Sequence, residues 1–228
     1  MEGIVNVDKP PGVSSARLVA RVKRLLPRGT KIGHAGTLDP FATGVLLLLV
    51  GKATKVCERL MDSAKQYDAV IRLGATTETD DPETTAIPWT PTGGGELTTP
   101  NRETVESALK AFTGQIMQRP PPYSALKVGG RRAYDLARKG HVVALQLRQV
   151  DVYRIELLDY TWPLLRLRID CGRGTYIRAI ARDLGEALDV GGHLAELRRT
   201  GVGKFRIQDA IRPETLETDG IETHLKEP

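Results

Sequence analysis

Four segments of the chain have apolar patterns that predict strands. Every second residue is apolar over residues 165–170, and this period of two indicates a strand with one buried face. The unbroken apolar run at residues 45–50 predicts a buried strand. Residues 3–7 and 65–74 also have strand character. The expected strands therefore come from both halves of the chain.

Apolar residues spaced three or four positions apart predict helices between these strands. The expected helices cover residues 18–26, 53–61, 105–112 and 177–188. Ser14 or Ser15 can cap the first, Thr99 is expected to cap the third, and a pair of glycines ends the last. Residues 84–99 are rich in Thr, Pro and Gly and predict a flexible loop. Beyond Arg212, low apolar content predicts either a final helix or a frayed end.

Composition narrows the class of protein without identifying it. The 228 residues are 40% hydrophobic and 27% charged, which excludes a disordered chain and allows one large or two small domains. Lys and Arg number 33 against 28 Asp and Glu, and the net charge of +5 suits a polyanionic partner but supports RNA only weakly.

Two further features bear on location and on metal binding. Cys57 and Cys171 lie far apart without metal-ligand spacing, so neither a zinc site nor a disulfide scaffold is indicated. No signal peptide opens the chain, and its apolar runs are too short to span a bilayer. A reduced, cytoplasmic location is therefore expected.

Residues 33–46 contain the strongest candidate for a reactive group, Asp39. Glycines within the segment loosen its backbone, and Pro40 fixes the chain directly after the carboxylate. A residue before a proline is driven towards extended conformations, so Asp39 is expected to project from the lip of a loop. For an isolated Asp-Pro pair, the alternative is an ordinary turn aspartate that caps a backbone amide.

Two glycine-containing segments do not fit nucleotide-binding loops. Six residues separate Gly44 from Gly51 where a phosphate loop has four, and Ala53 follows the lysine where that loop needs Ser or Thr. Gly172 and Gly174 lack the third glycine of a dinucleotide-binding turn. The sequence therefore indicates no nucleotide cofactor.

Residues 33–46 as a whole follow the pattern G-H-x-G-x-L-D-P-x-A-T-G-x-L, which resembles the signature of the TruB family of pseudouridine synthases. Later motifs match the same family in the same order, and the resemblance extends over residues 3–212. It implies an α+β fold with a mixed, mostly antiparallel sheet, flanking helices and a central active-site cleft. It also implies that the run D-K-P-x-G-x-S-S at residues 8–15 supports the loop from beneath, with Lys9 as a buried ion-pair partner that has no catalytic role.

The resemblance assigns roles to individual residues. Asp39 is the catalytic residue, Tyr67 faces the target base, and Arg178 pairs with Asp39 so that a carboxylate in a dry pocket stays ionised. Tyr176 and Leu197 are expected to line or adjoin the base pocket. From the residues alone, Tyr67 could equally be a half-buried strand tyrosine, and Arg178 an arginine placed at a helix start for solubility.

Other residues are expected to contact the RNA or to respond to base flipping. His34 is the candidate to fill the space that the flipped base leaves. Residues 118–142 resemble an insertion that closes over the RNA stem-loop in this family. Its candidate phosphate contacts are Arg131, Arg132, Arg138 and Lys139. A solvated charged helix is the alternative for this insertion. Arg198, Arg199 and Lys204 are expected to add positive charge near the RNA path.

One loop departs from the family pattern. Glu78 stands where the family usually has Asp, and the usual spacing is lost at residues 82–85. This loop can therefore sit differently from its counterparts.

The sequence thus predicts a pseudouridine synthase catalytic domain at residues 1–212 and a tail at residues 213–228. Bacterial members usually continue into a PUA domain, for which no room is left, and the sequence leaves open whether the chain is naturally short. The expected substrate is uridine 55 in the T-loop of tRNA, and the expected state is a monomer that needs no cofactor, metal or membrane. Two alternatives stay open: a non-catalytic tRNA-binding chaperone, and a synthase that acts on another stem-loop RNA.

Overall fold

The computed structural model describes residues 1–124, 126–128, 131–132 and 145–227. The chain forms two compact units, the first from residues 1–68 and 197–228 and the second from residues 69–196. Strands β4 (Lys65–Leu73) and β12 (Gly192–Val202) contribute residues to both units. Most of the strand pairs are antiparallel, whereas β3 and β12 are parallel. The expected α+β fold with a mixed, mostly antiparallel sheet is confirmed.

The first unit is built on β1 and β3. Its elements are β1 (Gly3–Lys9), α1 (Ser15–Lys23), β2 (Ile32–His34), β3 (Thr43–Val50), the 3-10 helix η1 (Gly51–Val56), α2 (Cys57–Asp62), β13 (Phe205–Arg206), η3 (Ile207–Asp209), α6 (Pro213–Asp219) and η4 (Glu222–His224). Strands β1 and β3 run antiparallel, from Gly3 opposite Val50 to Lys9 opposite Gly44. Strand β2 pairs with the other edge of β3.

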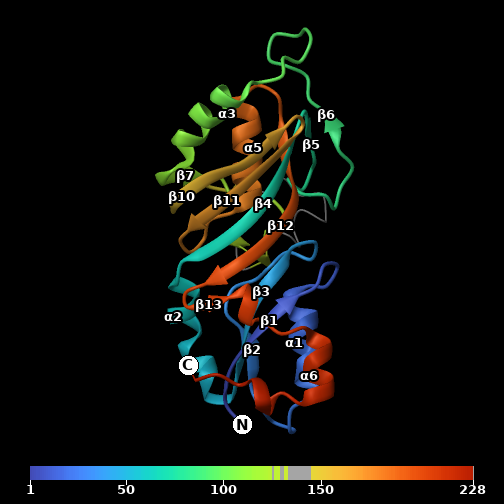
Figure 1. The fold of residues 1–228 in the computed structure, drawn as a ribbon, viewed down its shortest axis with the longest axis vertical. Coiled ribbons are helices and arrows are strands. Elements are labelled where there is room, and N and C mark those ends of the chain that lie inside the picture. The colour runs from blue at the N-terminus through green and yellow to red at the C-terminus, as the bar shows by residue number, and fades with distance from the viewer. Residues whose placement is uncertain (125, 129–130, 133–144, 228) are drawn as a thin grey trace. The chain divides into compact units, whose positions relative to one another are not determined.

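Strand β3 is buried on both faces, which explains why its sequence is an unbroken apolar run. Even-numbered side chains such as Leu46 pack with α1 and α6, and odd-numbered ones such as Leu47 pack with α2 and Phe205. Figure 1 shows α1 and α6 to one side of β3 and α2 to the other. Leu216 of α6 is fully buried in the first of these layers. Of the two alternatives for the chain beyond Arg212, the structure therefore has a packed helix and not a frayed end.

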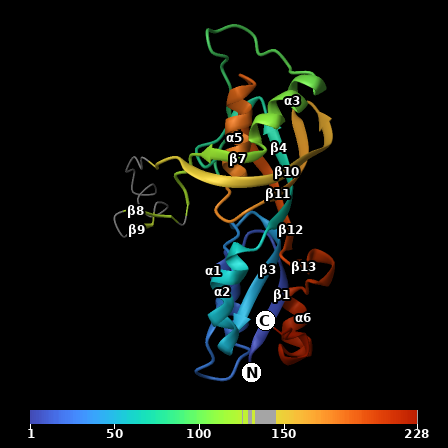
Figure 2. The same ribbon diagram turned by 90° about the vertical axis from the view of Figure 1, so that its left-hand side faces the viewer.

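The second unit contains the remaining elements. They are β5 (Ala75–Thr76), β6 (Ile87–Pro88), α3 (Arg102–Leu109), η2 (Lys110–Phe112), β7 (Gly114–Gln118), β8 (Lys127–Val128), β9 (Arg131–Arg132), β10 (Arg148–Thr161), β11 (Leu164–Cys171) and α5 (Ile177–Ala187). Strand β10 is antiparallel to both β11 and β7, and α3 lies next to α5 and β10 (Figure 2). The alternation in β11 is confirmed, because Leu165, Leu167 and Ile169 are fully buried.

The structure corrects several expected element boundaries. Ser14 caps α1 by accepting the backbone N–H of Arg17 at 3.2 Å, as expected. Asn101, and not Thr99, caps α3, because its Oδ1 accepts the backbone N–H of Thr104 at 2.9 Å. The helix expected over residues 53–61 is divided into η1 and α2. None of the helices in the described ranges is long and apolar enough to cross a membrane.

Candidate active site

Asp39 lies in the turn between β2 and β3, as the proline after it predicted. Residues 35–42 are neither helix nor strand, and Asp39 is half-buried. The backbone N–H of Ala42 donates to the carbonyl oxygen of Asp39 at 3.2 Å, which closes the turn. The carboxylate is therefore carried by a short closed turn and not by the face of a helix.

The segment at residues 9–15 supports this turn, as the resemblance implied. Lys9 is fully buried, and its Nζ donates to the carbonyl of Pro40 at 3.1 Å and to two carbonyls of its own segment. The backbone N–H of Gly12 donates to the same Pro40 carbonyl at 2.8 Å. The Ser15 hydroxyl accepts the N–H of Leu38 at 2.9 Å and donates to its carbonyl at 3.0 Å. Both neighbours of Asp39 are thus held from one side.

Arg199 reaches the same turn from β12. Its Nε donates to the carbonyl of Val45 at 2.7 Å, its Nη2 to that of Gly36 at 3.1 Å and its Nη1 to that of Thr37 at 3.4 Å. The side chain is 1% exposed. The guanidinium of Arg199 is therefore occupied by backbone carbonyls of the protein itself, and the expectation that its charge lies near the RNA path stays a prediction.

His34 is the last residue of β2 and pairs with Leu48 of β3. Burial lowers the pKa of the His34 ring, and the charge of Arg199 lowers that pKa further. Within the described residues, the buried Nδ1 has no hydrogen-bond partner. A neutral ring suits the predicted filling of the space left by a flipped base, and this role stays a prediction.

Tyr67 and Leu197 belong to the same unit as Asp39, on β4 and β12 respectively. Their side chains are nearly buried, at 9% and 8% exposure. Tyr176 and Arg178 belong to the other unit. The pairing of Arg178 with Asp39 therefore joins residues of different units and stays a prediction, as does the central cleft.

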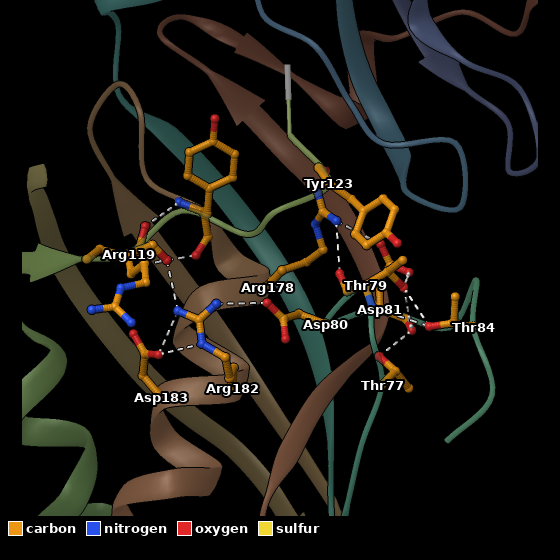
Figure 3. A network of polar contacts seen from close by, with 12 residues as sticks. Thr77, Thr79, Asp80, Asp81, Thr84, Arg119, Tyr123, Arg178, Arg182 and Asp183 are labelled. Carbon is orange, nitrogen blue, oxygen red and sulfur yellow. Dashed lines mark hydrogen bonds and ion pairs between the residues drawn. The ribbon is translucent and has the colours of Figure 1, made fainter. Parts of the chain in front are cut away.

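Arg178 forms a buried ion pair with Asp81 (Figure 3). Nη1 of Arg178 lies 3.0 Å from Oδ2 of Asp81, and the two side chains are 4% and 3% exposed. The same guanidinium donates to the carbonyl of Thr79 at 3.0 Å and to that of Tyr123 at 2.9 Å. Sequence reasoning missed Asp81, because its partner Arg178 is remote in the sequence.

The loop at residues 77–84 holds the Asp81 carboxylate in place. The backbone N–H of Glu83 donates to its Oδ1 at 3.0 Å, and the Thr79 hydroxyl donates to the same oxygen. The Thr77 hydroxyl donates to the backbone carbonyl of Asp81 at 2.8 Å. Asp81 therefore presents a fixed carboxylate to Arg178.

Arg182 makes a second pair one helical turn further along α5 (Figure 3). Its Nη1 lies 2.8 Å from Oδ2 of Asp80, and its Nε donates to Asp183 at 2.8 Å. Burial raises the pKa of the Asp80 carboxyl to about 6, against the opposing charge of Arg182. Two consecutive aspartates of the loop thus face two arginines at helical spacing.

Side-chain hydrogen bonds at both ends of residues 118–123 join this proline-rich segment to the rest of the second unit. Gln118 donates to the backbone carbonyl of Tyr176 at 3.0 Å and accepts its backbone N–H at 2.8 Å. The Tyr123 hydroxyl donates to Glu78, the residue that departs from the family pattern. Tyr176 therefore enters α5 with its backbone fixed on both sides.

The predicted RNA-contacting residues are only partly described. Arg131 and Arg132 form β9, which is antiparallel to β8. Arg138 and Lys139 lie outside the described residues. Lys204 is exposed, with its Nζ 5.6 Å from the centre of the Phe205 ring. The clamp therefore stays a prediction.

The described residues offer the chemistry of carboxylates, tyrosines and arginines. No three His, Cys, Asp or Glu side chains in that part of the chain are gathered as metal ligands. A half-buried carboxylate on a closed turn can attack an electrophilic carbon or remove a proton. The arrangement therefore suits nucleophilic or acid–base catalysis by Asp39.

Family models match nearly the whole chain. Residues 23–177 match the model described as TruB family pseudouridylate synthase (N terminal domain). The chain belongs to the TruB family. Residues 178–227 match a second model, the tRNA pseudouridylate synthase B C-terminal domain. As a TruB-family protein, the chain is a pseudouridine synthase, an isomerase that converts uridine to pseudouridine.

Curated relatives of this TruB-family protein bear the name tRNA pseudouridine synthase B. The protein from Xanthomonas campestris pv. campestris (strain B100) is 47% identical over 216 residues, which are 95% of this chain and 68% of the relative. That from Cupriavidus metallidurans is 44% identical over 224 residues, 97% of this chain and 69% of the relative.

Solved structures show the same fold. A chain in the crystal structure of a Cbf5-Nop10-Gar1 complex superposes with a TM-score of 0.70 and 32% identity, over 97% of this chain and 57% of that one. A chain in an H/ACA RNP bound to a substrate RNA containing 2′-deoxyuridine gives 0.68 and 30%, over 97% and 56%. This TruB-family chain thus spans little more than half the length of these neighbours.

Proposed function

We propose that this TruB-family protein converts uridine 55 in the T-loop of tRNA to pseudouridine, with Asp39 as the catalytic carboxylate. The observation that carries the proposal is Asp39 on its closed turn, held by Lys9, Ser15 and Arg199. The relatives named tRNA pseudouridine synthase B support tRNA as the substrate. The run Q-x-P-P-x-Y-S-A-L-K at residues 118–127 resembles the bacterial tRNA enzyme more than guide-RNA-dependent relatives, which supports a stand-alone enzyme.

The reaction rearranges bonds within one nucleotide. The bond from ribose C1′ to uracil N1 breaks, the uracil turns, and a bond from C1′ to C5 forms. A proton leaves C5 and one is taken up at N1, so no co-substrate is consumed. Three roles suit the Asp39 carboxylate: attack on C6 of the base, attack on the sugar, or removal of a ribose proton. Each of these roles requires an ionised carboxylate.

The target base must leave the stack of the T-loop before it can react. Flipping costs a few kcal/mol, which stacking on the ring of Tyr67 would offset. The neutral ring of His34 would occupy the vacated space, since an uncharged imidazole can stack among bases without desolvating a charge.

The proposal is tested by incubating the purified protein with unmodified tRNA transcript and mapping pseudouridine by carbodiimide adduct stops. A stop at position 55 is expected, and none in a transcript with cytidine at that position. A stop at another position would show that the enzyme modifies a uridine in a different stem-loop. Tight binding without any stop would favour a tRNA chaperone.

Neutralising the basic insertion is expected to weaken RNA binding more than it slows chemistry. In the double variant Arg131→Gln/Arg132→Gln, the plot of log affinity against log salt should become flatter by about one to two units. The reason is that binding then neutralises fewer phosphates and releases fewer counterions. The single-turnover rate at saturating RNA should change much less, because Asp39 is untouched. Filter binding at several salt concentrations measures the first effect.

The matched control is Arg24→Gln/Arg28→Gln, which removes the same charge from exposed positions at and beyond the end of α1. Its salt slope should stay that of the wild type. An unchanged slope in the insertion variant, together with a collapsed saturated rate, would show that the insertion orders the catalytic residues and does not grip phosphates.

A further inference from the structure

We propose that Arg199 is a positioning residue that fixes the turn carrying Asp39 from both of its ends. This inference rests on the proposed function, in which Asp39 is the catalytic carboxylate. Arg199 is one of the largest fully buried side chains of the protein, and it comes from β12, a strand far from the turn in sequence.

The contacts of the guanidinium are distributed on both sides of Asp39. Gly36 and Thr37 precede the carboxylate by three and two residues, and Val45 follows it by six. One planar group with a fixed fork of donors therefore joins the two ends of the turn. A shift of this group would move both ends together, and with them the carboxylate.

The main chain of Arg199 reinforces the same connection. Arg198 and Arg199 pair in parallel with Thr43 and Gly44, directly after the turn. Gly44 has φ +102°, and a Cβ placed there would lie 2.2 Å from the carbonyl oxygen of Arg199. The absence of a side chain at Gly44 thus lets β12 approach closely enough for the guanidinium to reach carbonyls on both sides of Asp39.

The charge of Arg199 indicates a role beyond packing. In the described part of the chain, no carboxylate forms a salt bridge with it, and its hydrogen bonds go to three backbone carbonyls. Burying a cation on carbonyl dipoles alone is costly compared with burying an apolar side chain of similar volume. This cost is explained if the donors of Arg199 are needed to hold the turn.

Strand β12 would then serve the site with two side chains on one face. Leu197 and Arg199 are two residues apart, so both point to the same side of the strand, and both are buried. The strand therefore fixes the distance between Arg199, which holds the turn, and Leu197, the predicted pocket residue.

The test compares three variants with the wild type. Arg199→Met keeps most of the volume but removes donors and charge, and Arg199→Lys keeps the charge but lacks the fork. Leu216→Ala is the control, because it leaves a cavity in the same unit, in the cluster formed with α1, and does not contact the turn. For each, we would measure thermal stability, tRNA Kd, the single-turnover rate at saturating tRNA, and amide hydrogen exchange over residues 36–44.

Arg199→Met is expected to lower the single-turnover rate by at least about a hundredfold with Kd within about threefold, because small misplacements of a catalytic group have effects of this size. Arg199→Lys is expected to recover less than about tenfold of that loss. Exchange should increase over residues 36–44 in both variants. Leu216→Ala should lower the melting temperature and leave the rate per folded molecule near that of the wild type.

Several outcomes would overturn the inference. Full activity of Arg199→Lys would show that the turn needs only a positive charge and not the fork of donors. If Arg199→Met fails to fold, Arg199→Lys alone tests the inference. Wild-type exchange over residues 36–44 in either variant would show that the turn does not depend on the guanidinium, and this result is independent of activity. A wild-type protein that makes no pseudouridine would instead refute the proposed function, while the exchange data would still decide the role of Arg199.

Discussion

Asp39→Asn is expected to lower the single-turnover rate of pseudouridine formation by at least about a thousandfold, with Kd for tRNA within about tenfold of the wild type. Asparagine has nearly the size of aspartate, and the bonds that close and support the turn run through backbone groups. The path of the turn should therefore persist, and the substitution removes the charge and basicity of the carboxylate. Carbodiimide mapping over time gives the rate, and filter binding gives the affinity.

The control for this substitution is Asp159→Asn, which makes the same change of charge at an exposed position on β10. Pro40 has no backbone N–H, so an asparagine before it cannot cyclise through that nitrogen and regenerate aspartate. Residual turnover near the wild-type rate in Asp39→Asn would therefore exclude Asp39 as the catalytic group. Equal losses in both variants would point to net charge and not to a specific role.

The turn around Asp39 was predictable because its signals are local. Pro40 acts on the residue directly before it, and the nearby glycines allow the backbone to turn. The cap of α1 at Ser14 was predictable for the same reason. The start of α3 was misplaced by two residues because Thr99 and Asn101 are both good caps, and only the three-dimensional path of the chain decides which one meets an amide.

Arg199 and Asp81 were not predictable in the same way, because their partners are remote. Arg199 meets Gly36 across 163 positions of the chain, and Asp81 meets Arg178 across 97. The run L-R-R-T at residues 197–200 does not show which of its two arginines points into the protein interior. The buried arginine also breaks the apolar alternation of β12, so that strand was not expected.

Strand β10 was missed for a related physical reason. Its pairing with β11 shifts register between Val152 and Arg154 and again between Leu157 and Asp159. Each irregularity moves the following side chains to the opposite face, so no single period of two runs through its 14 residues. A local pattern therefore could not predict a strand whose side chains change face along its length.

Arg178→Met is expected to have the second large effect, because it removes one half of a buried ion pair and the predicted partner of Asp39. The single-turnover rate should fall by at least about a hundredfold, and the free energy of unfolding by about 3–5 kcal/mol, since the Asp81 carboxylate is left buried without its cation. Arg178→Lys should recover only part of the rate, because an ammonium cannot replace the fork that meets Asp81 and two carbonyls.

A double variant separates stability from catalysis at this position. Arg178→Met/Asp81→Asn should be more stable than Arg178→Met alone, because no charge is left buried without a partner, and it should remain equally inactive. Arg182→Met is the matched control, one turn later on α5 and paired with Asp80 of the same loop, and its rate should stay within about tenfold of the wild type. Urea unfolding and single-turnover assays measure the two effects. If Arg182→Met lost as much rate as Arg178→Met, both arginines would act only by holding the loop at residues 77–84, and Arg178 would have no separate role towards Asp39.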